Sequence, residues 1–75
     1  MTTAARKARL EAQVSEVVGA PVEITIRGER KFTFSVDHIN QDLEFYLVQF
    51  FGKAMSVDSV AIDDECGTFV YMTAA

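Results

Sequence analysis

Residues 22–36 most constrain the fold, because apolar and polar side chains alternate there on both sides of a single glycine. Such alternation is typical of strands that bury one face, and Gly28 marks a turn between two of them. The segment therefore predicts a β-hairpin. Parity favours the three-residue loop 28–30, since a two-residue loop would place an apolar residue opposite Lys31. The pairs expected in this register are Ile26 with Phe32, Ile24 with Phe34, and Val22 with Val36.

Residues 4–18 have the spacing of an amphipathic helix, with apolar side chains at i, i+4, i+7 and i+8. These apolar residues are Leu10, Val14, Val17 and Val18. Gly19 and Pro21 end the pattern. Arginine and lysine near the start oppose the helix dipole, so residues 1–8 are expected to fray.

A second helix is predicted at 40–51, with Asp37 or Asn40 as its cap and Gly52 at its end. Its inward side is expected to carry Ile39, Leu43, Tyr46, Leu47, Phe50 and Phe51. Since each residue turns a helix by about 100°, Phe45 and Val48 point away from that side.

Two more strands are expected after this helix, over residues 60–62 and 68–72. A three-residue loop, Glu65-Cys66-Gly67, leaves Phe69 and Tyr71 on the side opposite the core. The inner face in that register is made of Val60, Ile62, Val70 and Met72. A four-residue loop that starts at Asp64 buries the two aromatic rings instead. Both registers remain open at this point.

The expected element order is α-β-β-α-β-β in a single α+β domain covering residues 1–75. Opening a ferredoxin-like β-α-β-β-α-β chain after its first strand and joining its ends gives this same order. By analogy we expect a four-stranded antiparallel sheet of order 3-4-2-1 with both helices on one face.

Charge is unevenly distributed along the chain, whose net charge is −4. Residues 1–31 carry six Lys and Arg against four Glu, whereas residues 32–75 carry Lys53 alone against seven acids. The acidic second part argues against broad contact with nucleic acid and favours a protein partner with a basic surface. No apolar run reaches the roughly 18 residues of a membrane span, and no secretory signal begins the chain. A cytoplasmic location is therefore expected.

The candidate chemical groups do not combine into a catalytic or metal site. His38 has no Ser or Cys as an immediate neighbour in sequence, and negative charge around Cys66 disfavours its reactive thiolate. One Cys and one His are too few for a structural zinc site, and Asp63-Asp64-Glu65 lacks the spacing of a calcium loop. No glycine-rich phosphate-binding motif is present. We therefore expect no catalysis and no cofactor or metal.

Two surfaces remain as candidates. Phe45 and Val48, with Asp42 and Gln49 around them, make an apolar centre with a polar rim, unless the first helix covers them. The second surface depends on the register left open above.

If Phe69 and Tyr71 are exposed, they share a sheet face with Arg27, Lys31 and Thr33. That arrangement is similar to the stacking surface of the RNA-recognition motif. The glycine-aromatic signature of that family and a basic charge balance are missing, so direct nucleic-acid binding is not favoured.

In size, acidity and helix-hairpin layout, the chain resembles the phage-encoded inhibitors of host defence, anti-CRISPR proteins in particular. The features that carry the resemblance are the acidic turn at 63–65, Asp42 and Glu44 on the second helix, and the lack of a catalytic constellation. The resemblance implies a stoichiometric inhibitor in the host cytoplasm that covers the Lys and Arg side chains with which its target holds RNA or DNA. Phe45 or Tyr71 would be the buried anchor.

The contact residues expected on this basis are Asp42, Glu44, Phe45, Val48, Gln49, Asp63, Asp64, Glu65, Phe69 and Tyr71. A homodimeric assembly module is the alternative, because a second copy would enlarge a small core.

Overall fold

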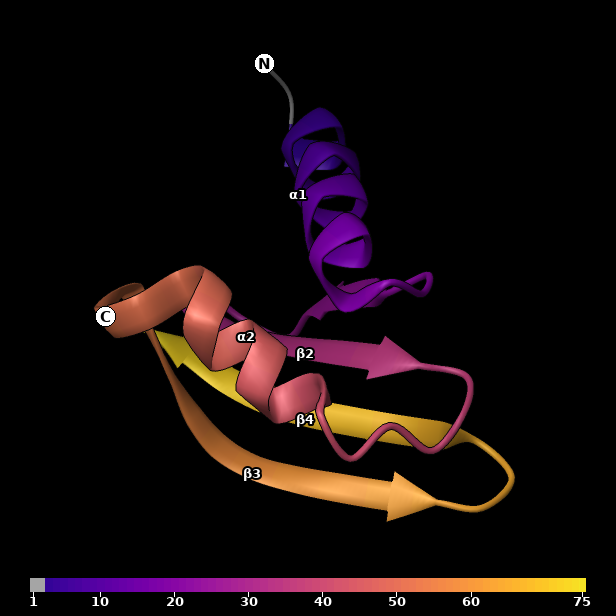
Figure 1. The fold of residues 1–75 in the computed structure, drawn as a ribbon. Coiled ribbons are helices and arrows are strands. Elements are labelled where there is room, and N and C mark those ends of the chain that lie inside the picture. The colour runs from indigo at the N-terminus through magenta and orange to yellow at the C-terminus, as the bar shows by residue number, and fades with distance from the viewer. Residues whose placement is uncertain (1–2) are drawn as a thin grey trace.

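The structure, a computed structural model, describes residues 3–75. Its elements are α1 (Thr3–Val18), β1 (Glu23–Ile26), β2 (Lys31–Val36), α2 (Leu43–Phe51), the short 3-10 helix η1 (Gly52–Ala54), β3 (Met55–Asp63) and β4 (Gly67–Ala74). The predicted α-β-β-α-β-β order and α+β class are confirmed (Figure 1). The four strands form an antiparallel sheet of order β1-β2-β4-β3, which is the predicted order.

The first hairpin has the predicted register, with Ile26 opposite Phe32 and Ile24 opposite Phe34. The Arg27 N–H donates to the Lys31 carbonyl over 2.8 Å and closes the three-residue loop. Parity alone was therefore enough to select the loop length, because only an odd loop keeps apolar residues opposite one another.

The second hairpin differs from both expected registers. Asp63 pairs with Gly67, so the loop is Asp64-Glu65-Cys66, one residue earlier than the three-residue loop that the sequence suggested. The Asp63 carboxylate accepts the N–H groups of Glu65 (2.8 Å) and Cys66 (3.0 Å), and Gly67 follows with a φ of +110°. This aspartate turn fixes the loop.

From Ser59 to Asp63 each residue's partner thereby shifts by two positions, which leaves the faces as the three-residue loop predicts. Val70 and Met72 are buried, whereas Phe69 and Tyr71 lie half-buried on the opposite face. The four-residue loop, which would have buried both rings, is wrong.

One face of the sheet holds the core, and both helices cover that face. The buried apolar residues are Val14 from α1, Leu43 and Leu47 from α2, and Val22, Ile24, Phe34, Val36, Val70 and Met72 from the sheet and the residue preceding it. Phe51 of α2 packs against Phe34, with ring centroids 5.3 Å apart. Within residues 3–75 no helix lies over the other face, which we call the open face.

α1 contacts the rest of the chain mainly through its second half, and its beginning extends away from the sheet (Figure 1). Val14 is buried, but Val17, predicted on the same stripe, is exposed because it lies to one side of the contact. Gly19, with a φ of +82°, donates its N–H to the Ser15 carbonyl and ends the helix as predicted.

α2 begins at Leu43, three residues later than predicted. The Asn40 side-chain oxygen accepts the Asp42 N–H over 3.0 Å, and the Asn40 N–H donates to the Thr68 hydroxyl over 2.8 Å. These two bonds hold Asn40 in a turn. Ile39, expected on the inward side of the helix, therefore lies in the preceding loop and is 49% exposed.

The remaining differences lie at the margins of the sheet and of α2. Ile26, Val60 and Ile62 are on the core side of the two outer strands, yet all three are exposed because neither helix reaches over them. Phe50, at the end of α2, is also partly exposed, against the prediction. A bulge between Val57 and Ser59 keeps Val57 and Val60 on the same side of β3 despite their odd spacing.

Candidate protein-interaction surface

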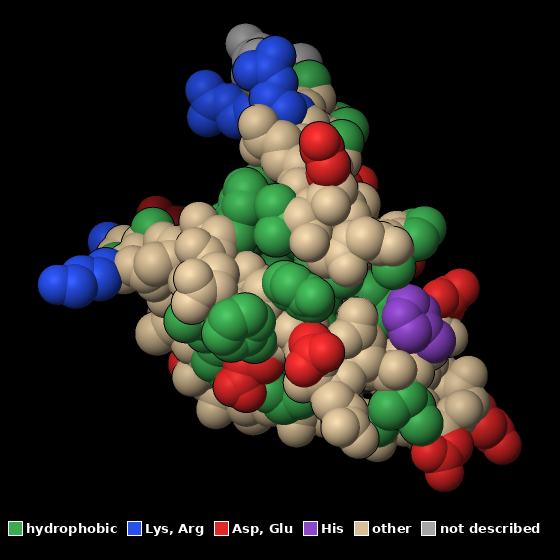
Figure 2. Space-filling model, in the orientation of Figure 1, with side chains coloured by type: hydrophobic (Ala, Val, Ile, Leu, Met, Phe, Trp, Pro, Cys, Tyr) green, Lys and Arg blue, Asp and Glu red, His purple; other side chains and the backbone are tan. Residues whose placement is uncertain are grey.

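The outward side of α2 carries an apolar pair surrounded by polar groups. We define the outer face of α2 as Asp42, Glu44, Phe45, Val48 and Gln49, all of which are exposed. Phe45 is 59% exposed and Val48 is 43% exposed, so α1 does not cover them. The Tyr46 ring supports Phe45 from the side, with centroids 5.9 Å apart. Figure 2 shows hydrophobic side chains over α2 next to acidic ones.

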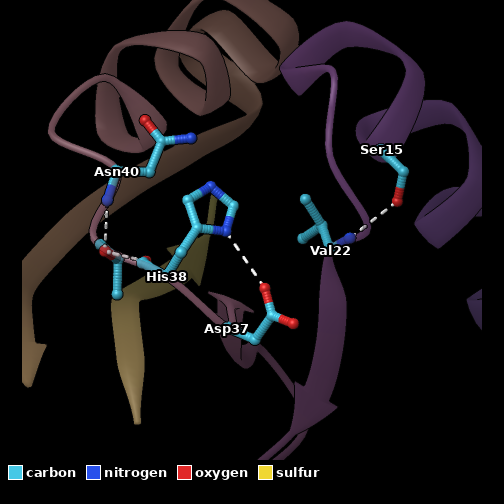
Figure 3. Close-up of polar contacts among 6 residues, drawn as sticks. Ser15, Val22, Asp37, His38 and Asn40 are labelled. Carbon is cyan, nitrogen blue, oxygen red and sulfur yellow. Dashed lines mark hydrogen bonds and ion pairs between the residues drawn. The ribbon is translucent and has the colours of Figure 1, made fainter. Parts of the chain in front are cut away.

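α2 is held in place by its packing against the sheet and by hydrogen bonds in the loop that precedes it. Leu43 and Leu47 are fully buried against the sheet. The Thr68 hydroxyl donates to the His38 carbonyl (2.9 Å) and accepts the Asn40 N–H, which ties the loop before α2 to β4 (Figure 3). The orientation of the outer face therefore depends on a buried hydroxyl from the far end of the sequence.

The acidic turn, Asp63-Asp64-Glu65, lies beside that same loop. Gly67, which follows the turn, approaches the backbone of residues 36–38 so closely that an added Cβ would lie 2.9 Å from the His38 nitrogen. Asp37 is nearby on the loop and pairs with His38, with 3.1 Å between Oδ1 and Nδ1 (Figure 3). The hydrogen bond from His38 lowers the pKa of the Asp37 carboxyl.

Phe69 and Tyr71 are not part of the outer face of α2, because the sheet separates them from it. They lie on the open face, where the Arg27 guanidinium is 5.1 Å from the centre of the Tyr71 ring. Thr33 is opposite Tyr71 and only 7% exposed, and its hydroxyl has no hydrogen-bond partner among residues 3–75. The predicted contact residues thus divide into three groups: the outer face of α2, the acidic turn and the open face.

Charge in the folded chain remains segregated. Among the described residues no Lys or Arg forms an ion pair with a carboxylate. Arg6, Lys7 and Arg9 are near the free end of α1, as the blue side chains in Figure 2 show, far from the acidic turn at the opposite corner. The carboxylates of the acidic turn and of α2 are therefore available to a basic partner.

The sequence reasoning did not identify an apolar groove between α1 and the first hairpin. Its floor is made of Leu10, Ile24, Ile26 and Phe32, with Arg6 and Lys7 at its rim, and its volume is about 400 Å³. The apolar residues were each assigned to the core from their periodicity. Only the tilt of α1, which the sequence pattern does not contain, opens the space between them.

Two kinds of feature are absent from residues 3–75: a cluster of metal-ligating side chains and a membrane-spanning helix. No group of three or more His, Cys, Asp or Glu side chains in residues 3–75 is placed to hold a metal. In the same range, no helix combines the length and apolar character needed to cross a bilayer. Cys66, which directly follows the acidic turn, is a free, exposed thiol.

The turn bonds at Asp63 predict a specific acid titration. Hydrogen bonds from the backbone N–H groups of Cys66 and Glu65 lower the pKa of the Asp63 carboxyl from its ordinary 3.8. The pKa of Asp63 is lower in the folded chain than in the unfolded chain. The ionised carboxylate therefore stabilises the fold at a pH above the unfolded pKa, and this stabilisation is lost as the pH falls through the folded pKa. In an NMR titration we expect the Asp63 carboxyl and the Glu65 and Cys66 amides to share a midpoint below 3.8. A midpoint at or above that value would contradict the turn geometry.

Comparison with protein-family models, with curated proteins and with solved structures yields no match, so the surfaces described above are assigned from the residues of this chain alone.

Proposed function

We propose that this chain is a small acidic protein-binding module that inhibits its target stoichiometrically, by covering a basic surface with which the target holds RNA or DNA. The contact surface is the outer face of α2, with the acidic turn as a second point of contact. This is the mode of action that the resemblance to anti-CRISPR inhibitors implies.

The observation that carries the proposal is the exposure of Phe45. Phe45 is 59% exposed on a helix of nine residues and is not part of the buried core, yet an apolar ring loses water favourably when a partner buries it. Val48 enlarges the apolar centre, and Asp42 and Glu44 flank it. An aromatic anchor inside a polar rim is the usual composition of an interface hot spot.

Electrostatics supports the choice of a basic target. The carboxylates on α2 and in the acidic turn have no Lys or Arg partner among residues 3–75. They attract a basic surface without first breaking an internal ion pair, and they compete there with phosphate groups. Since exposed charges are screened, binding weakens as salt rises.

Phe45→Ala is expected to weaken target binding about thirtyfold, because a central aromatic anchor contributes about 2 kcal/mol or more. The experiment immobilises the wild-type chain and its variants side by side, captures the target from a bacterial lysate, and titrates the purified target by calorimetry. The titration should give a fixed stoichiometry, and the chain should displace bound RNA or DNA from the target.

Ile26→Ala is the matched control, since Ile26 is also exposed and apolar but lies in the first hairpin, away from α2. It should bind like the wild type. Asp42→Lys combined with Glu44→Lys should weaken binding and flatten its salt dependence. Equal capture by the Phe45→Ala variant and the wild type would refute the proposal.

Single-stranded nucleic-acid binding is the second candidate, and one observation favours it. The open face presents Phe69 and Tyr71 together with Arg27 and Lys31. Aromatic rings on an open sheet stack on unpaired bases. A salt-dependent shift of a labelled oligonucleotide that is lost in Tyr71→Ala would favour this candidate. We expect no shift, because the chain is acidic overall.

A further inference from the structure

The two edges of the sheet differ in how far other segments of the chain cover them. At the β1 edge, the Val22 N–H donates to the Ser15 hydroxyl and the Ile24 N–H donates to the Glu11 carboxylate, both over 2.9 Å (Figure 3 shows the first). α1 thus occupies part of the edge of a strand that is only four residues long. The opposite edge belongs to β3, which has nine residues and no such covering among residues 3–75.

The hydrogen-bond ladder shows which groups of β3 are unpaired. The Ala74 N–H donates to the Arg30 carbonyl, so even-numbered residues of β4 bond to β2 and odd-numbered ones bond to β3. Phe69 and Tyr71 pair with Ala61 and Ser59, which therefore bond to β4. Val60 and Ile62 must direct their N–H and C=O groups outward, where no described residue receives them.

The side chains of β3 do not protect this edge. Natural sheets discourage edge pairing with Lys, Pro, short strands or bulges. β3 contains no Lys, Arg, Pro or Gly, and its bulge at Asp58 affects only the first half of the strand. Beyond the bulge, Val60 and Ile62 are 40% and 51% exposed and add apolar area next to the unpaired amides.

We propose that β3 pairs with β3 of a second copy of this chain, antiparallel about a two-fold axis at Val60, to form a continuous eight-stranded sheet. Because Asp58 is the extra residue of the bulge, Ile62 lies opposite Val57 of the second copy and Asp63 lies opposite its Ser56, so no carboxylate faces another. An isologous contact of this kind closes on itself and gives a dimer.

Charge complementarity is the reason for choosing a second copy as the occupant. The two-fold register brings the acidic turn of each copy to the start of β3 in the other, opposite residues 54–56. Lys53, the single cation among residues 32–75, is exposed just before that start. The dimer therefore gains two symmetric contacts between Lys53 and Asp64 or Glu65, groups that have no ion-pair partner within the described part of one chain.

Concentration-dependent amide exchange tests the pairing directly. In sedimentation experiments the wild-type chain should dimerise, and the amides of Val60 and Ile62 should exchange more slowly as the protein concentration rises. The Ile26 amide is the internal control, because it points outward from the β1 edge with no partner in residues 3–75 and should stay fast at every concentration. Val60→Pro removes an N–H group that points outward and makes no hydrogen bond to β4, so the β3–β4 pairing keeps its bonds. The variant should weaken the dimer about tenfold.

A charge swap distinguishes this contact from any other dimer. Lys53→Glu alone and Asp64→Lys with Glu65→Lys should each weaken the homodimer about tenfold, because like charges then face each other. Mixing these two variants should restore dimers as 1:1 heterodimers, and combining all three substitutions in one chain should restore the homodimer. Phe45→Ala should dimerise like the wild type, so the outcome is independent of the proposed function.

Two results would overturn the proposal. The first is a wild-type chain that stays monomeric at millimolar concentration with Val60 and Ile62 amides as fast as that of Ile26. The second is a dimer whose stability is unchanged by Val60→Pro and by the charge swap.

Discussion

Gly67→Ala is expected to reduce the free energy of unfolding by at least about 3 kcal/mol, through a steric clash combined with backbone strain. An alanine Cβ would overlap the Val36 carbonyl oxygen and lie 2.9 Å from the His38 nitrogen and 3.0 Å from the Asp37 carbonyl carbon. These are backbone atoms, so no side chain can rotate out of the way. The φ of +110° is a conformation that residues with a Cβ rarely adopt.

The loss is large for this chain, because a domain of 75 residues is stable by about 4–11 kcal/mol. Urea denaturation of the wild type and the variant measures the difference. Gly28→Ala is the matched control from the other hairpin, since no atom lies within 4 Å of its added Cβ and its φ is not positive. It should change stability by less than about 0.5 kcal/mol. A Gly67→Ala variant as stable as the control would show that β4 does not approach residues 36–38 as described.

Much of the fold was predictable because it follows from local periodicity. The alternation around Gly28 predicted the register of the first hairpin. The alternation of side chains along β4 likewise predicted that Phe69 and Tyr71 lie on one face of the sheet and Val70 and Met72 on the other. The helical angle between neighbouring residues likewise predicted that Phe45 points away from the core. These predictions depend only on the repeat of a strand or a helix.

The features that the sequence did not predict depend on contacts between distant segments. The late start of α2 is set partly by the bond between Asn40 and Thr68, which are 28 positions apart. The bulge at Asp58 and the aspartate turn at 63–66 changed which residues of β3 and β4 pair with each other. Hydrophobic periodicity contains no information about either feature. Periodicity also assigned Val60 and Ile62 to the core, since it cannot tell an edge strand from a central one.

The candidate contact residues were predicted as separate surfaces, but the sequence did not show where those surfaces lie relative to one another. The sheet places Phe69 and Tyr71 on the open face, while both helices cover the other face. One binding event therefore cannot use the outer face of α2 and the open face together unless the partner wraps around the molecule. A small chain with these two separate surfaces can bind two partners at once, and the β3 edge proposed for a second copy is separate from both.

Thr68→Val is expected to cost about 2–4 kcal/mol of stability, although the two side chains have nearly the same shape. Thr68 is 1% exposed, and its hydroxyl donates to the His38 carbonyl and accepts the Asn40 N–H. Valine keeps the β-branched packing but leaves both backbone groups without a partner in a part-buried position. An unpaired group of this kind costs about 1–3 kcal/mol.

Thr68→Ser keeps the hydroxyl and loses only a methyl group, so it should be the less damaging change, by about 1 kcal/mol or less. Urea denaturation compares the two variants, and exchange of the Asn40 amide reports the local bond. We expect that amide to exchange faster in Thr68→Val and at the wild-type rate in Thr68→Ser. Equal stability of the two variants would mean that the hydroxyl does not hold the loop before α2. In that case Leu43 and Leu47, which are fully buried, would have to fix the orientation of the outer face by themselves.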